Sequence, residues 1–508
     1  MHTPELHEPR FESLVSELIY DSGFCLGVSK AALVQTAKIP TRVLPQERSE
    51  ALRRDLRALP FVTIDGEDAK DFDDAVYVER RKEGFRLQVA ISDVAHYVPE
   101  GSALDEHARK RGTSVYLGNR VLPMLPERLS NHMCSLLPGE ERLCLVVDMV
   151  LDAQGRFLET EIYPALIQSA ARLTYEMVQR CFEGSPPKQL RPFVPMLATA
   201  RVLAARLHAL RAQRGALELQ LSERRLEFDA QGVPSHIRLS RQQESHRLIE
   251  AFMLRANEAV ARYAERRGLP VLFRCHGAPD LQKLHFFSKA VKALGLSMGK
   301  ANPREFSRLL GLVREKPEER LLEHLLLRSM SQAVYSGKNE GHYGLGSSAY
   351  VHFTAPIRRY PDLWTHRVLK ACWAKTLVPV EAKVLSELGR HCSEQEHVAM
   401  RLEREVISCG GAYVAQRHIE KSFEGTIVGF AKKGCFIELD GLWVEGLFKL
   451  KEFGRGAYFD EKNYCVQLPG GRTLGVGTRC KVRIHDVYAR LGHVRLKYLS
   501  LTKKQRGA

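Results

Sequence analysis

The sequence predicts an α+β protein in which a large mixed domain precedes a small barrel of five short strands. Three observations lead to this prediction. The 508 residues are too many for one small domain and suit two to four domains with their own cores. Strand-like alternation and helical periodicity succeed one another through the centre of the chain. From residue 419 onward the pattern changes to short strands punctuated by glycine, which is typical of small barrels.

The charge balance points to a polyanionic partner. Lys and Arg number 76 against 60 Asp and Glu, a net charge of +16. Such an excess predicts binding to nucleic acid or to an acidic membrane surface. No stretch approaches the roughly 18 to 20 uninterrupted apolar residues of a membrane span, and the polar N-terminus lacks the apolar core of a secretory signal. We therefore expect a soluble, cytoplasmic protein that does not contact a membrane.

Cysteine usage fits the same compartment. The chain has 11 cysteines, an odd number, spread from Cys25 to Cys480 without a Cys-x-x-Cys pair. A closed disulfide set or a zinc knuckle is disfavoured by this spacing. We expect reduced, buried thiols.

Residues 1–45 are expected to form a short helical segment. Residues 11–20 have the spacing of an amphipathic helix, and a glycine-containing turn follows. Ser29 is placed to cap a second short helix, which Pro40 would stop. Two short helices around such a turn suit either a helix-turn-helix or a packing extension of the next domain, and we favour the extension.

The large domain, residues 46–418, is expected to mix strands and helices. Period-2 alternation predicts strands at residues 61–64, 75–79, 85–92, 143–151 and 158–167. Patterns with the helical period predict helices at residues 194–214, 242–267, 281–292, 303–313, 318–334, 362–375 and 380–418.

The C-terminal part, residues 419–503, is expected to form the barrel, with a short basic tail at 504–508. Its predicted strands are residues 423–430, 435–439, 442–449, 465–468 and 478–487. Residues 419–508 hold 17 Lys and Arg against nine Asp and Glu, so half of the net charge lies there. A solvated basic surface would explain the charge. A nucleic-acid-binding barrel explains it better, because bases stack on aromatic side chains such as Phe423, Phe430, Phe436, Trp443, Phe448 and Tyr458.

An acidic cluster interrupts the first strands of the large domain. Six carboxylates within ten residues are offset only by Lys70: Asp65, Glu67, Asp68, Asp71, Asp73 and Asp74. Carboxylates packed this tightly raise each other's pKa. The flanking apolar residues indicate that the loop leaves a sheet. The loop has two interpretations, a solvated turn and a site for hard divalent cations, and the residues alone favour neither. In the second interpretation, paired magnesium ions would clamp a phosphodiester for attack by water.

A second cluster runs from His342 to His366 and centres on two consecutive arginines, Arg358 and Arg359. Guanidinium groups match phosphate oxygens in shape and charge. The alternative is a buried ion-pair network with Asp362, which would account for one arginine but leaves the second unexplained.

The local pattern before these arginines predicts the start of a helix. Pro356 suits the first turn and Thr354 is a candidate cap. Both arginines would then lie at the N-terminal end of the helix, where backbone N–H groups also favour anions.

Together the two clusters resemble those of the RNB family, the ribonuclease II and ribonuclease R exoribonucleases, with the acidic motif closer to ribonuclease R. Residues 63–76 resemble the metal-site motif of the family, and residues 342–366 match its signature at each defined position. Shorter similarities occur at residues 112–116, 122–127, 171–175 and 250–257. The resemblance implies a large mixed RNB catalytic domain at residues 46–418. It also implies a five-stranded, OB-type S1 barrel at residues 419–503.

The resemblance implies roles residue by residue. Asp65, Asp71, Asp73 and Asp74 would hold two magnesium ions, and Asp73 would be the carboxylate most needed for the chemical step. Arg358 would grip the scissile or adjacent phosphate. The remaining implied RNA contacts are Tyr116, Tyr175, Glu250, Arg359, Tyr360 and Glu403.

Ordinary structural roles compete with several of these assignments. Tyr116 could be a core tyrosine, and Arg359 with Tyr360 could support the fold instead of the substrate. Glu250 and Glu403 lie on predicted helices, where salt bridges are the default.

The implied activity is magnesium-dependent, hydrolytic 3′→5′ degradation of single-stranded RNA to nucleoside 5′-monophosphates. We expect a monomer and see no signal for a stable protein partner. Two rivals stay open: a catalytically silent RNA-binding regulator and a dedicated RNA 3′-end processing enzyme. Members of the family usually carry two cold-shock barrels before the catalytic domain, and residues 1–45 have no room for them. We therefore expect RNA to be guided by the catalytic channel and the C-terminal barrel alone.

Overall fold

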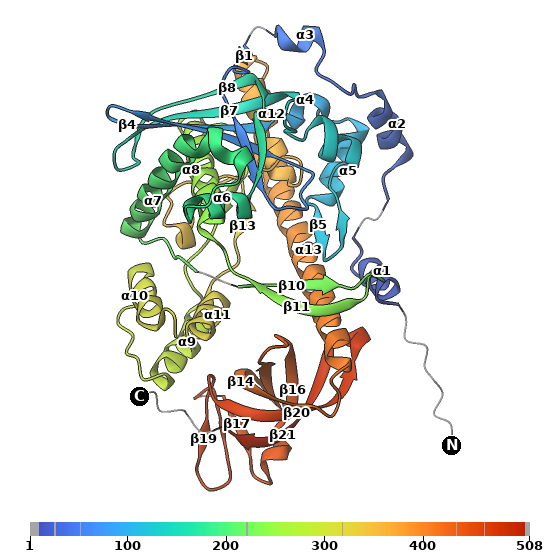
Figure 1. The fold of residues 1–508 in the computed structure, drawn as a ribbon, viewed down its shortest axis with the longest axis vertical. Coiled ribbons are helices and arrows are strands. Elements are labelled where there is room, and N and C mark those ends of the chain that lie inside the picture. The colour runs from blue at the N-terminus through green and yellow to red at the C-terminus, as the bar shows by residue number, and fades with distance from the viewer. Residues whose placement is uncertain are drawn as a thin grey trace.

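The computed structural model describes residues 10–24, 27–50, 52–219, 222–316, 318–432, 434–461 and 463–502. The predicted tail at 504–508 lies outside these ranges. A seven-stranded sheet forms the centre, in the order β1-β8-β7-β4-β3-β2-β9 (Figure 1). Its strands are β1 Arg54–Asp55, β2 Val62–Asp65, β3 Asp74–Arg81, β4 Gly84–Ser92, β7 Glu141–Asp152, β8 Phe157–Gln168 and β9 Ala171–Thr174.

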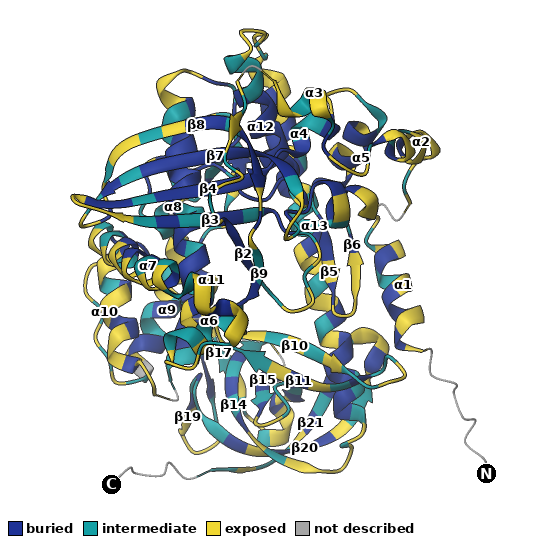
Figure 2. Ribbon diagram, turned by 45° about the horizontal axis from the view of Figure 1, so that its top comes forward, coloured by how far each residue is buried: buried dark blue, intermediate teal, exposed yellow. Residues whose placement is uncertain are grey.

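The middle of the sheet is antiparallel, whereas its two outermost pairs, β1 with β8 and β2 with β9, are parallel. The central strands β4 and β7 are buried on both faces, whereas β1 and the first half of β8 are largely exposed (Figure 2). One face packs against the helices α7, α8 and α12 in the largest apolar cluster. A smaller cluster covers the other face. Most residues of β4 and β7 are buried, and the polar residues Arg86 and Gln88 of β4 are both paired with Asp148 of β7.

The helices surround this sheet and lead to the C-terminal part. Their bounds are α6 Tyr175–Phe182, α7 Val194–Arg214, α8 Glu244–Arg266, α9 Leu281–Ala293, α10 Pro303–Val313, α11 Glu319–Ser329, α12 Tyr360–Trp373 and α13 Ala382–Gln416. Figure 1 shows α13 running from the sheet to the C-terminal strands. The helix expected at 318–334 is too long, because α11 ends at Ser329 and Val334 begins β13 (Val334–Ser336), which pairs with β12 (Phe273–Cys275).

The C-terminal strands close into a barrel in the order β14-β15-β16-β21-β20. These strands are β14 Ser422–Ala431, β15 Gly434–Leu439, β16 Glu445–Lys449, β20 Arg479–Tyr488 and β21 His493–Leu501. Five barrel strands were expected, but one of them was assigned wrongly. The segment at 465–468 lies in β18 (Cys465–Gln467), which joins a separate three-stranded sheet. The fifth barrel strand is β21, which alternates polar and apolar residues but was not identified from the sequence.

The two expected N-terminal helices are present as α1 (Phe11–Asp21) and α2 (Lys30–Lys38), with the Ser29 hydroxyl accepting a hydrogen bond from the backbone of Ala32. They pack on different elements: α1 contacts α13, and α2 contacts α5 (Ala103–Arg111). The packing extension that we favoured fits this arrangement.

One helical stretch, Lys188–Arg214, is long and apolar enough to cross a membrane by length and composition alone. The sequence-based expectation that no stretch comes near this length is therefore too strict. Within this stretch, Leu197 and Leu203 are buried in the central apolar cluster. Arg201 forms an ion pair of 2.6 Å with Glu244 on α8. These contacts attach the helix to the core, although only 28% of its apolar window is buried.

The cysteines are free throughout the described parts of the chain, and most are buried. Reduced thiols were expected, and the structure agrees.

The crossing of α13 over β13 gives a test of the fold. A Cβ added at Gly389 would lie 2.7 Å from the backbone carbonyl oxygen of Tyr335, whereas one added at Gly311 in α10 meets nothing within 4 Å. Alanine favours a helix over glycine by about 1 kcal/mol. We expect Gly311→Ala to raise the midpoint of urea unfolding slightly and Gly389→Ala to lower it. Equal shifts for the two variants would show that the crossing is not close.

Candidate functional site

The acidic loop connects β2 to β3 at one edge of the sheet, as the sequence predicts. Asp65 is the last residue of β2 and Asp74 the first of β3. Ser135 holds the loop in place. Its hydroxyl accepts a hydrogen bond from the backbone N–H of Phe72 (3.0 Å) and donates one to the carbonyl of Lys70 (2.7 Å). Because these contacts hold residues 70–72, this part of the loop is not a solvated turn.

Three of these carboxylates have raised pKa values. Burial is the largest cause for each, and it raises the pKa of Asp74 to about 7. The pKa of Asp73 rises well above its ordinary value, and that of Asp65 rises too. The neighbouring carboxylates raise these pKa values further, whereas Arg358 lowers them. The loop therefore concentrates negative charge in a poorly hydrated place, where a cation would be stabilised.

Asp73 has the most informative contacts. Its Oδ1 accepts a hydrogen bond from the backbone N–H of Ile357 at 2.9 Å. Its Oδ2 is buried without a hydrogen-bond partner and lies 3.3 Å from Nε of Arg358. A buried carboxylate oxygen without a partner costs free energy, which a bound cation would offset.

The oxygen-rich donor set of this loop suits magnesium, a hard cation. Within the described ranges no three His, Cys, Asp or Glu side chains converge closely enough to form a finished metal site. The fit to a metal therefore rests on the orphaned oxygen of Asp73 and on the mutual repulsion of the carboxylates.

The two consecutive arginines have different surroundings. Arg359 forms a 2.7 Å ion pair with the fully buried carboxylate of Asp362, which also accepts a hydrogen bond from the backbone N–H of Ala355 at 2.8 Å. Arg358 keeps 44% of its side chain exposed beside Asp73. The ion-pair interpretation thus holds for Arg359, and Arg358 is left available to an anion.

The expected helix begins later than the sequence indicates. It starts at Tyr360 with Pro361 in its first turn, so Pro356 lies in the preceding turn and Arg359 takes the cap position. Thr354 does not cap a helix, since its hydroxyl accepts a hydrogen bond from the Asn257 side chain at 3.4 Å. The sequence Tyr360-Pro361 carries the same proline signal that was assigned to Pro356.

Much of the segment 342–366 is structural and serves to present Arg358. The Asn257 side chain on α8 accepts a hydrogen bond from Phe353 N–H and donates one to the hydroxyl of Tyr350. Nε2 of His366 lies 2.8 Å from the Phe353 carbonyl. Asn257 falls in a stretch that the sequence singles out, but only the structure shows that it supports this segment.

Tyr116 lies over the acidic loop. It belongs to β5 (Val115–Leu117), pairs with β6 (Arg120–Leu122), and is 42% exposed. Its hydroxyl donates to Oδ2 of Asp71 at 3.3 Å, and its backbone N–H donates to Oε1 of Glu403 on α13 at 2.9 Å. Tyr116 is therefore not a core tyrosine. Glu403 makes this backbone contact, so that it fixes the strand that carries Tyr116.

Tyr175 lies next to the acidic loop in the fold, whereas Glu250 forms a salt bridge elsewhere. Tyr175 begins α6, directly after Thr174, which is in register with Asp65 across the β9–β2 pair. Burial raises the pKa of Tyr175, and the charges of Asp65 and Asp74 raise it further. Glu250 on α8 lies 3.5 Å from Arg211, which is the salt bridge that its helical position suggests.

Tyr360 is buried, and its hydroxyl bonds to a carboxylate on α5, not to one of the acidic loop. Its hydroxyl donates to Asp105 at 2.8 Å and accepts from Arg367 at 3.2 Å, and Arg367 pairs with Asp105 at 2.7 Å. This buried network ties α12 to α5. Of the two roles considered for Tyr360, its contacts match support of the fold.

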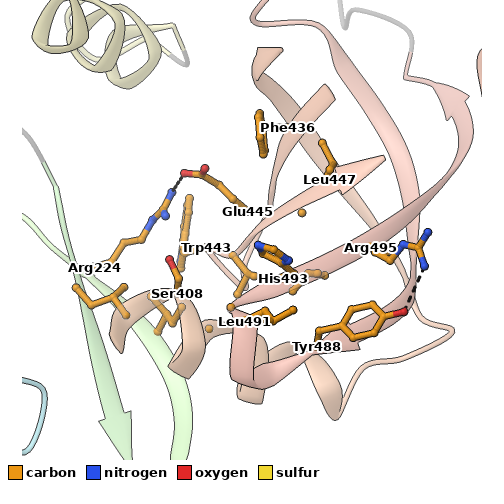
Figure 3. Close-up of a pocket in the computed structure, with 17 residues that line it drawn as sticks. Arg224, Ser408, Phe436, Trp443, Glu445, Leu447, Tyr488, Leu491, His493 and Arg495 are labelled. Atoms are coloured by element: carbon orange, nitrogen blue, oxygen red, sulfur yellow. Dashed lines mark hydrogen bonds and ion pairs between the residues drawn. The ribbon is translucent and has the colours of Figure 1, made fainter. Parts of the chain in front are cut away.

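A second concave region of about 560 Å³ lies where the barrel meets α13 and the β10–β11 hairpin (Glu223–Phe228 and Pro234–Ser240), as Figure 3 shows. Its wall includes the partly exposed rings of Phe436 and Tyr488. Arg224 of the hairpin reaches Glu445 at 2.6 Å, and Arg495 donates to the Tyr488 hydroxyl at 3.3 Å. The sequence identified Phe436 but missed Tyr488, which lies one residue beyond the strand expected at 478–487, and Arg495, which lies on the unrecognised strand β21.

Comparison with known families matches residues 53–375 to the RNB domain. Among curated proteins, ribonuclease R of Thermotoga maritima is 39% identical over 459 residues, covering 88% of this chain and 64% of that protein. Ribonuclease R of Escherichia coli K12 is 38% identical and covers 87% of this chain and 57% of its own length. The chain thus spans about six tenths of the length of these relatives.

Solved structures agree in fold. Mycoplasma genitalium RNase R in complex with ribose methylated single-stranded RNA superposes with a TM-score of 0.91 at 27% identity, covering 96% of this chain and 77% of that one. Yeast Ssd1, described as a pseudonuclease, gives a TM-score of 0.71 at 20% identity, covering 91% and 58%. The second match shows the shared fold alone.

The raised pKa of Asp74 predicts a pH dependence of stability. A carboxyl whose pKa is higher in the folded than in the unfolded chain binds its proton more tightly when folded, so the unfolding free energy falls as pH rises from about 4 to 7. Asn cannot ionise. In the presence of EDTA, Asp74→Asn should gain stability relative to the parent over this range, at about 1.4 kcal/mol per unit of pKa difference.

Asp68→Asn is the matched control for this measurement, since Asp68 is exposed on the same loop. Its unfolding free energy should stay parallel to that of the parent across the pH series. A parallel curve for Asp74→Asn as well would mean that Asp74 is not destabilised by burial.

Proposed function

Because the chain belongs to the RNB family, we propose that it is a hydrolytic 3′→5′ exoribonuclease that degrades single-stranded RNA to nucleoside 5′-monophosphates. The observation that carries this proposal is the pairing of Arg358, half exposed, with Asp73, whose buried Oδ2 has no hydrogen-bond partner. A site of this kind offers negative oxygens to a metal and a guanidinium to a phosphate within the same few ångströms. A purely structural site seldom needs both carboxylate oxygens for a metal and a guanidinium for a phosphate.

Asp65, Asp71, Asp73 and Asp74 are the residues that would hold magnesium. When bound, the metal would supply a water of lowered pKa and neutralise charge on the phosphate. Two features of the chain support this assignment. Arg358 lowers the pKa values of Asp65, Asp73 and Asp74, which favours their ionised form. The backbone N–H groups of Gly66 and Ile357 hold Asp65 and Asp73 in place by hydrogen bonds.

The chain's own residues would bind and orient the RNA. Arg358 is free to contact a non-bridging phosphate oxygen and to stabilise charge that grows there during attack. Tyr116, anchored through its backbone by Glu403, offers an exposed ring for stacking on a base. Tyr175 follows the strand residue paired with Asp65, which places it beside the acidic loop. Arg359 and Tyr360 act indirectly, by fixing the turn that carries Arg358.

The two parts of the chain have different roles in this proposal. Residues 46–418 would form the RNB catalytic domain and residues 419–503 an S1 RNA-binding domain. The closed barrel and the concave region with Phe436 and Tyr488 support the second assignment. RNA, drawn by the net charge of +16, is the proposed partner, and a cytoplasmic monomer is the proposed form.

Two rivals differ in what they predict for the acidic loop. The pseudonuclease with the same fold shows that fold alone does not imply catalysis. A silent RNA-binding protein does not need four acidic residues kept at a sheet edge against their mutual repulsion, and this favours catalysis. A dedicated 3′-end processing enzyme would share the chemistry and differ only in its range of RNA substrates.

The chemical proposal is tested by Asp73→Asn on uniformly labelled single-stranded RNA with magnesium. The parent should release nucleoside 5′-monophosphates, and EDTA should abolish the release. Asp73→Asn should lower kcat by on the order of 10³-fold or more, since it removes a charge acting at the reacting phosphate. Asp68→Asn, on the exposed part of the same loop, should leave the rate unchanged.

Release of mononucleotides by Asp73→Asn at the parental rate would contradict the catalytic assignment. A parent that binds RNA without degrading it would favour the silent regulator. Rapid cleavage of folded RNA 3′ ends combined with poor cleavage of unstructured RNA would favour the processing enzyme.

The barrel assignment is tested by Phe436→Ala and Tyr488→Ala. Base stacking on one ring contributes about 1–3 kcal/mol. Each variant should raise KM for a long single-stranded RNA by about five- to 100-fold and leave kcat/KM on a very short oligonucleotide unchanged. Tyr20→Ala, at an exposed ring on α1, is the control and should change neither value. Equal losses on long and short RNA would place these rings outside the RNA path.

A further inference from the structure

A stacked aromatic pair lies beside the acidic loop. The ring of Tyr175 on α6 stacks on the imidazole of His246 on α8, with centroids 3.9 Å apart and planes inclined by 17°. Both side chains are half-buried. Such close, nearly parallel stacking fixes the plane of a ring that would otherwise rotate about its side-chain bonds.

The place of Tyr175 gives this stack its significance. Thr174 caps α6 and is the Cα partner of Asp65, so Tyr175 leaves the sheet at the same edge as the acidic loop. The charges of Asp65 and Asp74 act on its hydroxyl and raise its pKa. Tyr175 therefore lies beside the carboxylates at which a substrate would react.

His246 is itself held firmly. It lies in the first turn of α8, and its Nδ1 accepts a hydrogen bond from the backbone N–H of Gln243 at 3.3 Å. With Nδ1 as acceptor, the neutral imidazole carries its proton on Nε2. Burial favours this neutral form by lowering the pKa of His246. The imidazole is thus a fixed surface under the tyrosine ring.

A purely structural role for His246 would be the helix cap. Glu and Gln are the residues that serve best at this third position of a capping box. An imidazole is not needed for the cap, whereas a flat ring is needed for the stack. This difference separates the two roles.

We propose that His246 is a positioning residue that fixes the Tyr175 ring against the nucleotide at the carboxylate site. This inference rests on the proposed function and extends it to a residue that does not itself touch the reacting atoms. Its physical basis is that small misplacements of a group that orients the substrate cost on the order of 10²-fold in rate.

Two complementary variants separate the stack from the cap. His246→Gln keeps an acceptor for Gln243 N–H but removes the ring, and His246→Phe keeps a ring but removes the acceptor. We expect His246→Gln to lower kcat/KM on single-stranded RNA by about tenfold, with its thermal unfolding midpoint unchanged. His246→Phe should retain kcat/KM within about threefold and show a lower midpoint, because a lost cap costs about 1 kcal/mol.

A double-mutant cycle with Tyr175→Ala completes the test. If His246 acts through Tyr175, then adding His246→Gln to Tyr175→Ala should cause no further loss in kcat/KM. Independent, multiplicative losses would overturn the proposal. So would loss of activity in His246→Phe with retention in His246→Gln, since that pattern identifies the cap as the role.

The parent enzyme distinguishes this proposal from the one it rests on. Mononucleotide release by the parent, combined with parental rates in His246→Gln, would overturn the role of His246 and leave the proposed function standing. A parent that releases no mononucleotide would overturn both.

Discussion

Mutual repulsion of carboxylates at one edge of a sheet is the constraint on which much of this structure depends. Asp65 and Asp74 end and begin neighbouring strands, so the sheet itself brings them together. Burial adds to the cost, as the raised pKa values of Asp65, Asp73 and Asp74 show. The surrounding contacts offset part of that cost through Ser135, the Ile357 N–H and the guanidinium of Arg358. A bound cation would offset the rest of the free-energy cost of burying these carboxylates.

The need to hold Arg358 next to Asp73 explains why the interior of the second cluster, residues 342–366, is polar. Arg358 can lie next to Asp73 only if the turn before α12 is rigid. The Asp362 carboxylate fixes that turn by receiving both the Ala355 N–H and the Arg359 guanidinium. Asn257 fixes the preceding strand-like segment from α8. Oδ1 of Asp362 joins these polar groups, whereas its Oδ2 is buried without a hydrogen-bond partner.

The sequence was sufficient for the family, for the central strands and long helices, and for the location of the acidic loop. These features depend on local periodicity and on dense motifs. The sequence was insufficient where tertiary contacts decide. Two prolines, Pro356 and Pro361, offered the same helix-start signal, and packing selected the later one. Strand β21 was missed although its residues alternate, and the segment at 465–468 was placed in the wrong sheet. No periodicity could reveal that Arg359 is paired inside while Arg358 stays exposed.

Helix α13 joins the two parts of the molecule over 35 residues. Glu403 on this helix fixes the strand of Tyr116, and Ser408 and Gly411 further along line the concave region at the barrel. Eight residues of helix span about 12 Å, and a helix does not stretch. The spacing between the two regions is therefore set by a rigid rod, not by a flexible tether. Under the proposed function, an RNA that engages both regions must have a minimum length, and the helix would set the shortest fragment that both regions hold together.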